Sequence, residues 1–281
     1  MGKTARSALL VVLFFCFVVF PASSEARSPL PMLKLEKEML RLVNLDRAGE
    51  NLPPLKWHRK SAEIARSHSR DMAVNDYFAH ESPETGFAKE RFFAGRVPTA
   101  TLGENLALAT SVVEAEDMLL KSAEHRANIM NADYTHIGIG IVRDGEGHLY
   151  VTQNFLIPIE RVDLPLATRN WARKISDERV RQGLGSLRWH TQLTAAAQKH
   201  SKLMMKRGDM FQPNHKALAK LGIFRVVKSV VSIAPSLEAL SEIDVVLEDR
   251  FHSIGVYAER NTREPEFYGF LYVTILLGGR Q

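Results

Sequence analysis

The stretch Thr135–Phe155 reads THIGIGIVRDGEGHLYVTQNF, and it predicts the central feature of the fold. Apolar residues alternate with small or polar ones on both sides of Asp144-Gly145, which is the period of a β-strand. An Asp-Gly pair supplies the positive φ angles that a tight hairpin turn requires. The sequence therefore predicts a β-hairpin with its turn at this pair.

Other elements are expected to cover this hairpin. Gly138 and Gly140 leave one face of the first predicted strand almost bare, and we expect a helix, rather than a ligand, to approach it. Apolar residues at helical spacing predict three helices, within 35–43, 64–72 and 112–119. Helices around a hairpin-bearing sheet indicate an α/β layered architecture. His68 and its later counterpart His200 fall on apolar stripes and are interpreted as core histidines.

Residues 1–26 predict a signal peptide that is removed on export. A basic start precedes an unbroken apolar run over 8–20, and small residues follow it as a cleavage region. Thirteen apolar residues are fewer than the roughly 20 that span a bilayer, so we expect no transmembrane segment after removal. The single cysteine, Cys16, lies inside the apolar run, which excludes a disulfide framework. We expect a periplasmic or extracellular protein.

Charge is unevenly distributed along the chain, whose formal net charge is +5. Residues 166–228 carry fourteen Lys or Arg against three acidic residues. This segment either provides ordinary solvated helix faces or meets an anionic envelope polymer or lipid surface. No nucleic-acid partner is expected, because the chain has no recognisable binding module for one.

The two halves of the chain repeat each other. LKWH at 55–58 returns as LRWH at 187–190, and the LYVT at 149–152 returns at 271–274. The spacing between copies falls from 132 to 122 residues, so the second copy is shorter in its middle. We expect two domains, at 33–160 and 166–281.

Three further motifs precede the hairpin: Phe78-Ala79-His80, Gly103-Glu104-Asn105-Leu106 and His125-Arg126-Ala127-Asn128-Ile129. In this order and spacing, the blocks resemble the CAP superfamily in its bacterial SCP-like form. The resemblance implies an α-β-α sandwich, followed here by a smaller, degenerate copy of the same fold. It also implies a cleft that contains His80, Glu104 and His125 and that holds a divalent metal, commonly zinc, in some members.

The chemistry of these residues is compatible with that implication. His80 and His125 are possible metal ligands, and two imidazoles with one carboxylate would form an open three-ligand site. Glu104 could instead orient an imidazole or act as a weak general base, which makes it the candidate catalytic residue. The family usually has a further glutamate where this chain has Ser122; Glu116 or Glu124 could replace it.

Two functions compete. The first is a binding module for an unknown ligand, such as a lipid or a cell-envelope polymer, with or without zinc; the second domain lacks the site motifs and serves packing or partner binding. The alternative is a metal-dependent, protease-like hydrolase that uses the same cleft. Against it, the chain has neither a His-Glu-x-x-His helix nor a nucleophile elbow. Ser82-Pro83 is interpreted as a turn rather than as a nucleophile. Enzymatic activity is therefore undecided, and binding is favoured.

Overall fold

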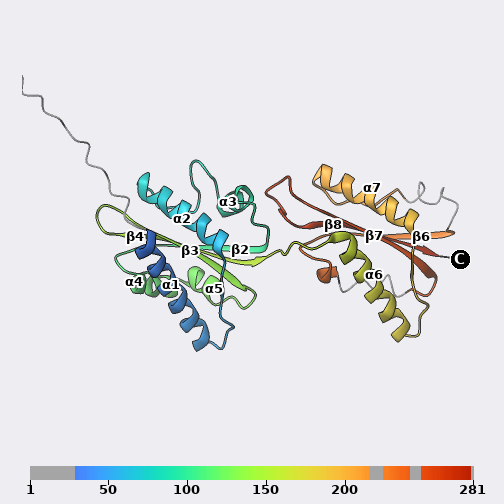
Figure 1. Ribbon diagram of the computed structural model, residues 1–281, viewed down its shortest axis with the longest axis horizontal. Coiled ribbons are helices and arrows are strands. Elements are labelled where there is room, and N and C mark those ends of the chain that lie inside the picture. Colours follow the sequence, from blue (N-terminus) through green and yellow to red (C-terminus); the bar gives the residue numbers. More distant parts are fainter. Residues whose placement is uncertain (1–28, 215–223, 241–247, 280–281) are drawn as a thin grey trace, which may run out of the picture.

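The computed structural model describes residues 29–214, 224–240 and 248–279 (Figure 1). The predicted signal peptide at 1–26 lies outside these ranges. Within them, no helix is both long and apolar enough to cross a membrane.

Each half of the chain contributes one set of helices and strands. The first set is α1 (Pro29–Gly49), β1 (Lys56–Trp57), α2 (Arg59–Val74), α3 (Ala88–Ala94), β2 (Thr99–Ala109), α4 (Val112–Lys121), α5 (Ala123–Ile129), β3 (His136–Arg143) and β4 (Leu149–Pro158). The second set is α6 (Leu164–Arg181), β5 (Arg188–Trp189), α7 (Thr191–Arg207), β6 (Val226–Ala234), the 3₁₀ helix η1 (Glu238–Leu240), β7 (Phe251–Arg260) and β8 (Leu271–Gly279).

The first half is a mixed α/β structure in three layers. Its sheet has the strand order β1-β3-β4-β2; β1 runs parallel to β3 and the other pairs are antiparallel. Helices α2 and α3 cover one face and α1, α4 and α5 the other (Figure 1). The main core lies on the second of these faces, where residues of α1 and α4 pack against alternate residues of β3 and β4. Strand β2 is left at the edge of the sheet, next to both helical layers.

The predicted hairpin is β3 and β4, but its turn differs from the prediction. The strands pair from His136 with Leu156 to Arg143 with Leu149, which leaves five residues in the loop. Oδ1 of Asp144 accepts hydrogen bonds from the backbone amides of residues 146, 147 and 148. The positive φ belongs to Gly147, at 102°. The prediction of a tight turn at Asp144-Gly145 was therefore wrong, because the Asp side chain organises a longer loop.

The bare face of β3 is occupied by helix α2, as predicted. A β-carbon on Gly138 would lie 2.4 Å from the amide nitrogen of Ala62, and one on Gly140 would lie 2.1 Å from that of Arg66. Only glycine permits this approach of strand and helix backbones.

The second half has a sheet with the corresponding order, β5-β7-β8-β6, again with one parallel and two antiparallel pairs. Helices α7 and α6 lie on its two faces (Figure 1). Gly255 of β7 meets α7 as the glycines of β3 meet α2: a β-carbon there would lie 2.4 Å from the carbonyl carbon of Leu193.

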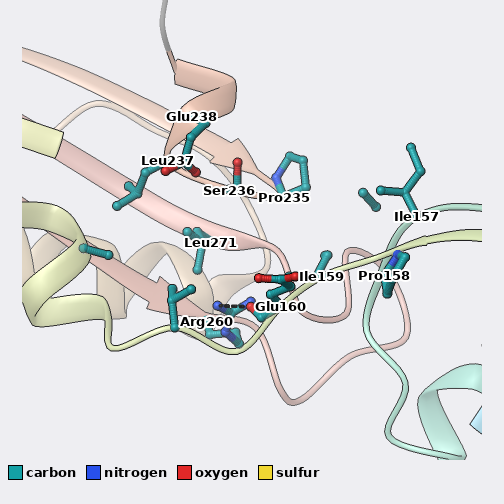
Figure 2. A pocket seen from close by; sticks show the side chains of 13 residues that line it. Ile157, Pro158, Ile159, Glu160, Pro235, Ser236, Leu237, Glu238, Arg260 and Leu271 are labelled. Carbon is teal, nitrogen blue, oxygen red and sulfur yellow. Dashed lines mark hydrogen bonds between the residues drawn. The ribbon is translucent and has the colours of Figure 1, made fainter. Parts of the chain in front are cut away.

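A cavity of about 430 Å³ lies where the two halves join. One wall is the end of β4 with the connection that follows it, from Ile157 to Glu160, and the opposite wall is Pro235–Glu238 with Leu271 (Figure 2). Arg260 lies below the connection and donates a 3.4 Å hydrogen bond to the carbonyl oxygen of Glu160. Apolar side chains such as those of Leu237 and Leu271 line it together with charged ones.

Candidate functional site

Three side chains form a hydrogen-bonded chain at the edge of the first sheet. Nδ1 of His80 lies 2.9 Å from Oε1 of Glu104, and Nη2 of Arg91 lies 2.6 Å from Oε2 of the same carboxylate. The Arg91 and Glu104 side chains are only 5% and 7% exposed, whereas that of His80 is 50% exposed. A buried ion pair therefore orients an imidazole that faces solvent.

The position of Glu104 on β2 explains the Gly-Glu-Asn motif. Successive side chains of a strand point to opposite faces, so Glu104 meets α3 on one face while Asn105 points to α5 on the other. Gly103 has no side chain because a β-carbon there would lie 2.5 Å from the hydroxyl of Tyr134 and 2.8 Å from Oδ1 of Asn128. Each residue of the motif thus has its own structural reason.

The second histidine, His125, lies in α5. Its carbonyl oxygen accepts a 3.1 Å hydrogen bond from Asn105, which ties α5 to β2. Burial lowers the pKa of His125, and the nearby His80 lowers it further. The structure hydrogen-bonds His80 to Glu104 and ties the backbone of His125 to Asn105, the next residue of the strand; that the three residues line one cleft stays a prediction.

A buried amide network supports this arrangement from the core side. Nδ2 of Asn105 also donates to Gln153, and Asn128 donates to Oδ1 of Asn105 at 2.8 Å. Gln153 in turn donates to Glu116, whose side chain lies inside the protein. Burial raises the pKa of Glu116 to about 8, while the hydrogen bond from Gln153 opposes this rise. Glu116 is thus a neutral acid of the core and does not replace the missing glutamate of the site.

This buried acid predicts a pH-dependent stability. The carboxyl of Glu116 binds a proton up to about pH 8 in the folded chain but only up to its ordinary pKa of 4.5 when unfolded. Between these values the folded state holds more protons, so its free energy of unfolding falls as pH rises. In the parent, Glu116 should make the free energy of unfolding fall by up to about 1.4 kcal/mol per pH unit in this range, and we expect Glu116→Gln to abolish this contribution. Urea denaturation at pH 5, 6, 7 and 8, taken as parent minus variant, measures the effect.

Glu114→Gln is the matched control for this experiment, because Glu114 is on the same helix but exposed, and hydrogen bonding by Thr110 lowers its pKa. It should leave the slope above pH 5 unchanged. A Glu116→Gln variant whose stability keeps the parent's pH dependence would contradict the assignment.

Two predictions about neighbouring residues are confirmed. His68 and His200 are buried, with 1% and 8% exposure, as expected of core histidines. Ser82 is 2% exposed, its hydroxyl donates to Asp71, and it accepts hydrogen bonds from the amides of residues 84 and 85. Ser82 therefore closes a turn, as its Ser-Pro context predicts.

Arg91 is the site residue that the sequence prediction missed. It lies in the short helix α3, and besides Glu104 it binds the carbonyl oxygens of His80 and Gly86. No periodicity marks α3 as carrying a buried cation. One signal was available: a carboxylate at a buried strand position, such as Glu104, needs a positively charged partner.

The donor set at hand does not fit a three-ligand metal site. Both oxygens of Glu104 are engaged, by His80 and by Arg91, so the free donors of the site are two imidazoles. Across the described ranges, no group of three or more His, Cys, Asp or Glu could hold a metal ion. Zinc binding by this site stays a prediction.

Residues 40–155 match the model of the cysteine-rich secretory protein family, CAP. Two proteins of Bacillus subtilis (strain 168) are similar: the uncharacterized membrane protein YlbC is 39% identical over 122 residues (43% of this chain, 34% of the relative), and the uncharacterized protein YkwD is 32% identical over 131 residues (44% of this chain, 51% of the relative). This segment is therefore a CAP (SCP-like) domain.

One solved structure is also similar to part of the chain. An extracellular protein containing an SCP domain from Bacillus anthracis str. Ames is 34% identical, with a TM-score of 0.42 and coverage of 46% of this chain and 43% of that chain. The chain spans between a third and about half of the length of the curated relatives it matches. The shared region is the first half, where His80, Glu104 and His125 lie.

Proposed function

We propose that the chain is an exported binding protein whose CAP domain recognises a ligand through His80 and His125. The observation that carries the proposal is the buried Arg91–Glu104 pair, which holds an exposed imidazole in one orientation. Fixing a binding group before the ligand arrives reduces the entropy lost on binding. Export is supported by the apolar N-terminal segment and by the extracellular SCP-domain relative.

The hydrogen bond to Glu104 also specifies what His80 offers to a ligand. A carboxylate paired with Arg91 can only accept, so Nδ1 of His80 donates to it, and in the neutral form of the ring Nε2 keeps its lone pair. In the described ranges no other residue bonds Nε2. The site therefore suits a ligand that presents a hydroxyl or amide donor, as an amino-sugar polymer of the cell envelope does.

Hydrolysis has less support than binding. A general base needs a free carboxylate or imidazole beside the attacking water, and Glu104 is engaged at both oxygens. The hydroxyl of Ser82 donates to Asp71 instead of to a histidine. No observation on the described residues favours the hydrolase alternative.

We also propose that the second domain, residues 166–281, is a degenerate CAP-like copy that has lost the site. Support comes from the equal strand order and from a repeated buried arginine: Arg47 and Arg179 are each fully buried and donate to backbone carbonyls. Arg179 belongs to the basic stretch 166–228, so that stretch is not one solvated surface. The second domain is assigned a role in partner binding.

The ligand is tested with two probes. Ring signals of His80 and His125 are followed by NMR while the mature chain is titrated with soluble amino-sugar oligomers or with phosphatidylglycerol vesicles. We expect the oligomers to shift both rings and the vesicles to shift neither. Shifts with vesicles alone would replace the polymer by a lipid, and no shift with either probe would overturn the proposal.

Zinc binding gives a separate prediction. We expect zinc to bind weakly and to be lost on dialysis, because metal sites that hold zinc firmly use at least three protein ligands. His80→Ala and His125→Ala should each abolish uptake in calorimetric titration, whereas His148→Ala, in the hairpin loop, should not. Stoichiometric zinc that survives dialysis, or uptake that is unchanged in both site variants, would show that the metal is held elsewhere.

A further inference from the structure

A groove runs along the outer edge of β7 in the second half of the chain. It has a volume of about 480 Å³ and is walled by the first turns of α6 and α7, with Trp189 and residues 256–260 of β7 also lining it. It is separate from the imidazole site of the first domain, because all of its lining residues follow residue 163.

Among the residues that the structure describes, none pairs with the edge of β7 along this groove. The amide of His190 donates to the carbonyl oxygen of Ile254 at 2.8 Å, and β5 ends just before it. Alternate residues of a strand direct their amide and carbonyl groups to the same side. Val256, Ala258 and Arg260 therefore present these groups to the groove. A free row of this kind is a template for another strand.

In the first domain the corresponding edge is closed by a salt bridge. The Glu36 side chain is fully buried, and its carboxylate accepts hydrogen bonds from Nε and Nη2 of Arg66 at 2.5 and 2.8 Å. The same carboxylate accepts the amide of Ile141 in β3, at 3.4 Å. A carboxylate from α1 thus takes the place of a neighbouring strand.

The second domain has lost this closure. Thr168 and Gln198 stand 132 positions after Glu36 and Arg66, and Ala258 replaces the larger Ile141 at the matching place in the strand. The hydroxyl of Thr168 donates to the carbonyl oxygen of Leu164, within its own helix. No side chain in the described ranges accepts the amide of Ala258. Shorter, uncharged side chains therefore open the groove and leave the strand edge accessible.

The groove carries positive charge. Arg169 stacks on Trp189, with its guanidinium carbon 5.7 Å from the ring centre, and Arg260 lies at the end of β7 below the domain connection (Figure 2). Within the described ranges, neither arginine forms an ion pair. The one carboxylate in the lining, Glu259, accepts a hydrogen bond from Tyr257. A carboxylate on the occupant would complement the two arginines.

We propose that this groove binds an extended, acidic peptide segment of a partner protein, which adds a strand to the edge of β7. Backbone hydrogen bonds to Val256, Ala258 and Arg260 supply sequence-independent affinity, and Arg169 and Arg260 select acidic side chains. The site does not depend on the ligand proposed for the CAP domain. It gives the second domain a binding function of its own.

The test uses the mature chain and three fluorescent peptides of ten residues. Each alternates valine or threonine with one polar residue, which is glutamate, glutamine or lysine. We expect the glutamate peptide to bind most tightly by fluorescence anisotropy and to slow amide hydrogen exchange at Val256, Ala258 and Arg260. Thr168→Glu/Gln198→Arg, which restores the closure of the first domain, should weaken binding about tenfold or more, since several hydrogen bonds are lost.

Two further variants keep the result interpretable. Val180→Glu/Leu203→Arg adds the same charges at exposed sites outside the groove and should leave affinity unchanged. Ala258→Pro removes one outward amide while keeping the ladder to β8, and it should weaken binding with the fold intact by circular dichroism. Failure of all three peptides to bind, or binding without protection of β7, overturns the proposal. Equal affinity for the glutamate and lysine peptides overturns its charge selectivity.

Discussion

Replacing Arg91 with methionine is expected to lower the free energy of unfolding by about 3–5 kcal/mol, the cost of breaking a buried ion pair from one side. The substitution leaves the Glu104 carboxylate, 7% exposed, without its 2.6 Å partner. It also removes the donor that binds the carbonyl oxygen of His80 at 3.0 Å. Urea denaturation, followed by circular dichroism, measures the loss.

Two companion variants separate charge from packing. Arg91→Met/Glu104→Gln removes both charges and should recover about half of the loss, since the two residues interact directly. Arg126→Met breaks the ion pair between Arg126 and Glu50, whose side chains are 45% and 53% exposed. It should lower the free energy of unfolding by less than about 1 kcal/mol. If Arg91→Met and Arg126→Met cost the same, the pair does not hold the site together.

The same variant also tests how the site is built. In the parent, the side chains of His80 and Arg91 bind the carboxylate of Glu104. Without Arg91, His80 is the one of these two that remains. His80 is then the group that must balance a partly buried negative charge. We therefore expect the ring signals of His80 to shift in the NMR spectrum of Arg91→Met even without ligand, and those of His148 to stay in place.

Local patterns predicted the elements well and the long-range polar contacts poorly. The hairpin of β3 and β4 followed from its alternation, because a strand with one buried face repeats every two residues. Its loop did not follow, because two glycines are available after Asp144 and only the folded side chain selects Gly147 for the positive φ. Turn chemistry depends on hydrogen bonds that composition does not reveal.

The site shows the same division. Nothing in the spacing of His80 and Glu104 indicates contact, and their proximity was predicted from the family motifs alone. Arg91 and the closing pair Glu36–Arg66 were not predicted, because a buried charge looks like a surface charge in a local pattern. Such residues become visible only when their partners are known, as the loss of that pair from the second domain illustrates.

Gly140→Ala is expected to lower the free energy of unfolding of the first domain by about 3 kcal/mol or more, at or beyond the upper range of overpacking. The added β-carbon would lie 2.1 Å from the amide nitrogen of Arg66 and 2.2 Å from the carbonyl carbon of Ala65. Both atoms belong to the backbone of α2, so no side-chain rotation can relieve the clash. The helix must move away from β3, and the buried contacts of Ala62 and Ala65 are then lost.

Gly145→Ala is the control, because it lies in the loop of the same hairpin with no atom within 4 Å of an added β-carbon. Its stability should stay within about 0.5 kcal/mol of the parent. Gly255→Ala makes the equivalent clash with α7 in the second domain, 2.4 Å from Leu193. If the two domains unfold separately, Gly140→Ala and Gly255→Ala shift different steps of the urea transition. A single step that moves equally in both variants would instead mean that the junction couples the two cores.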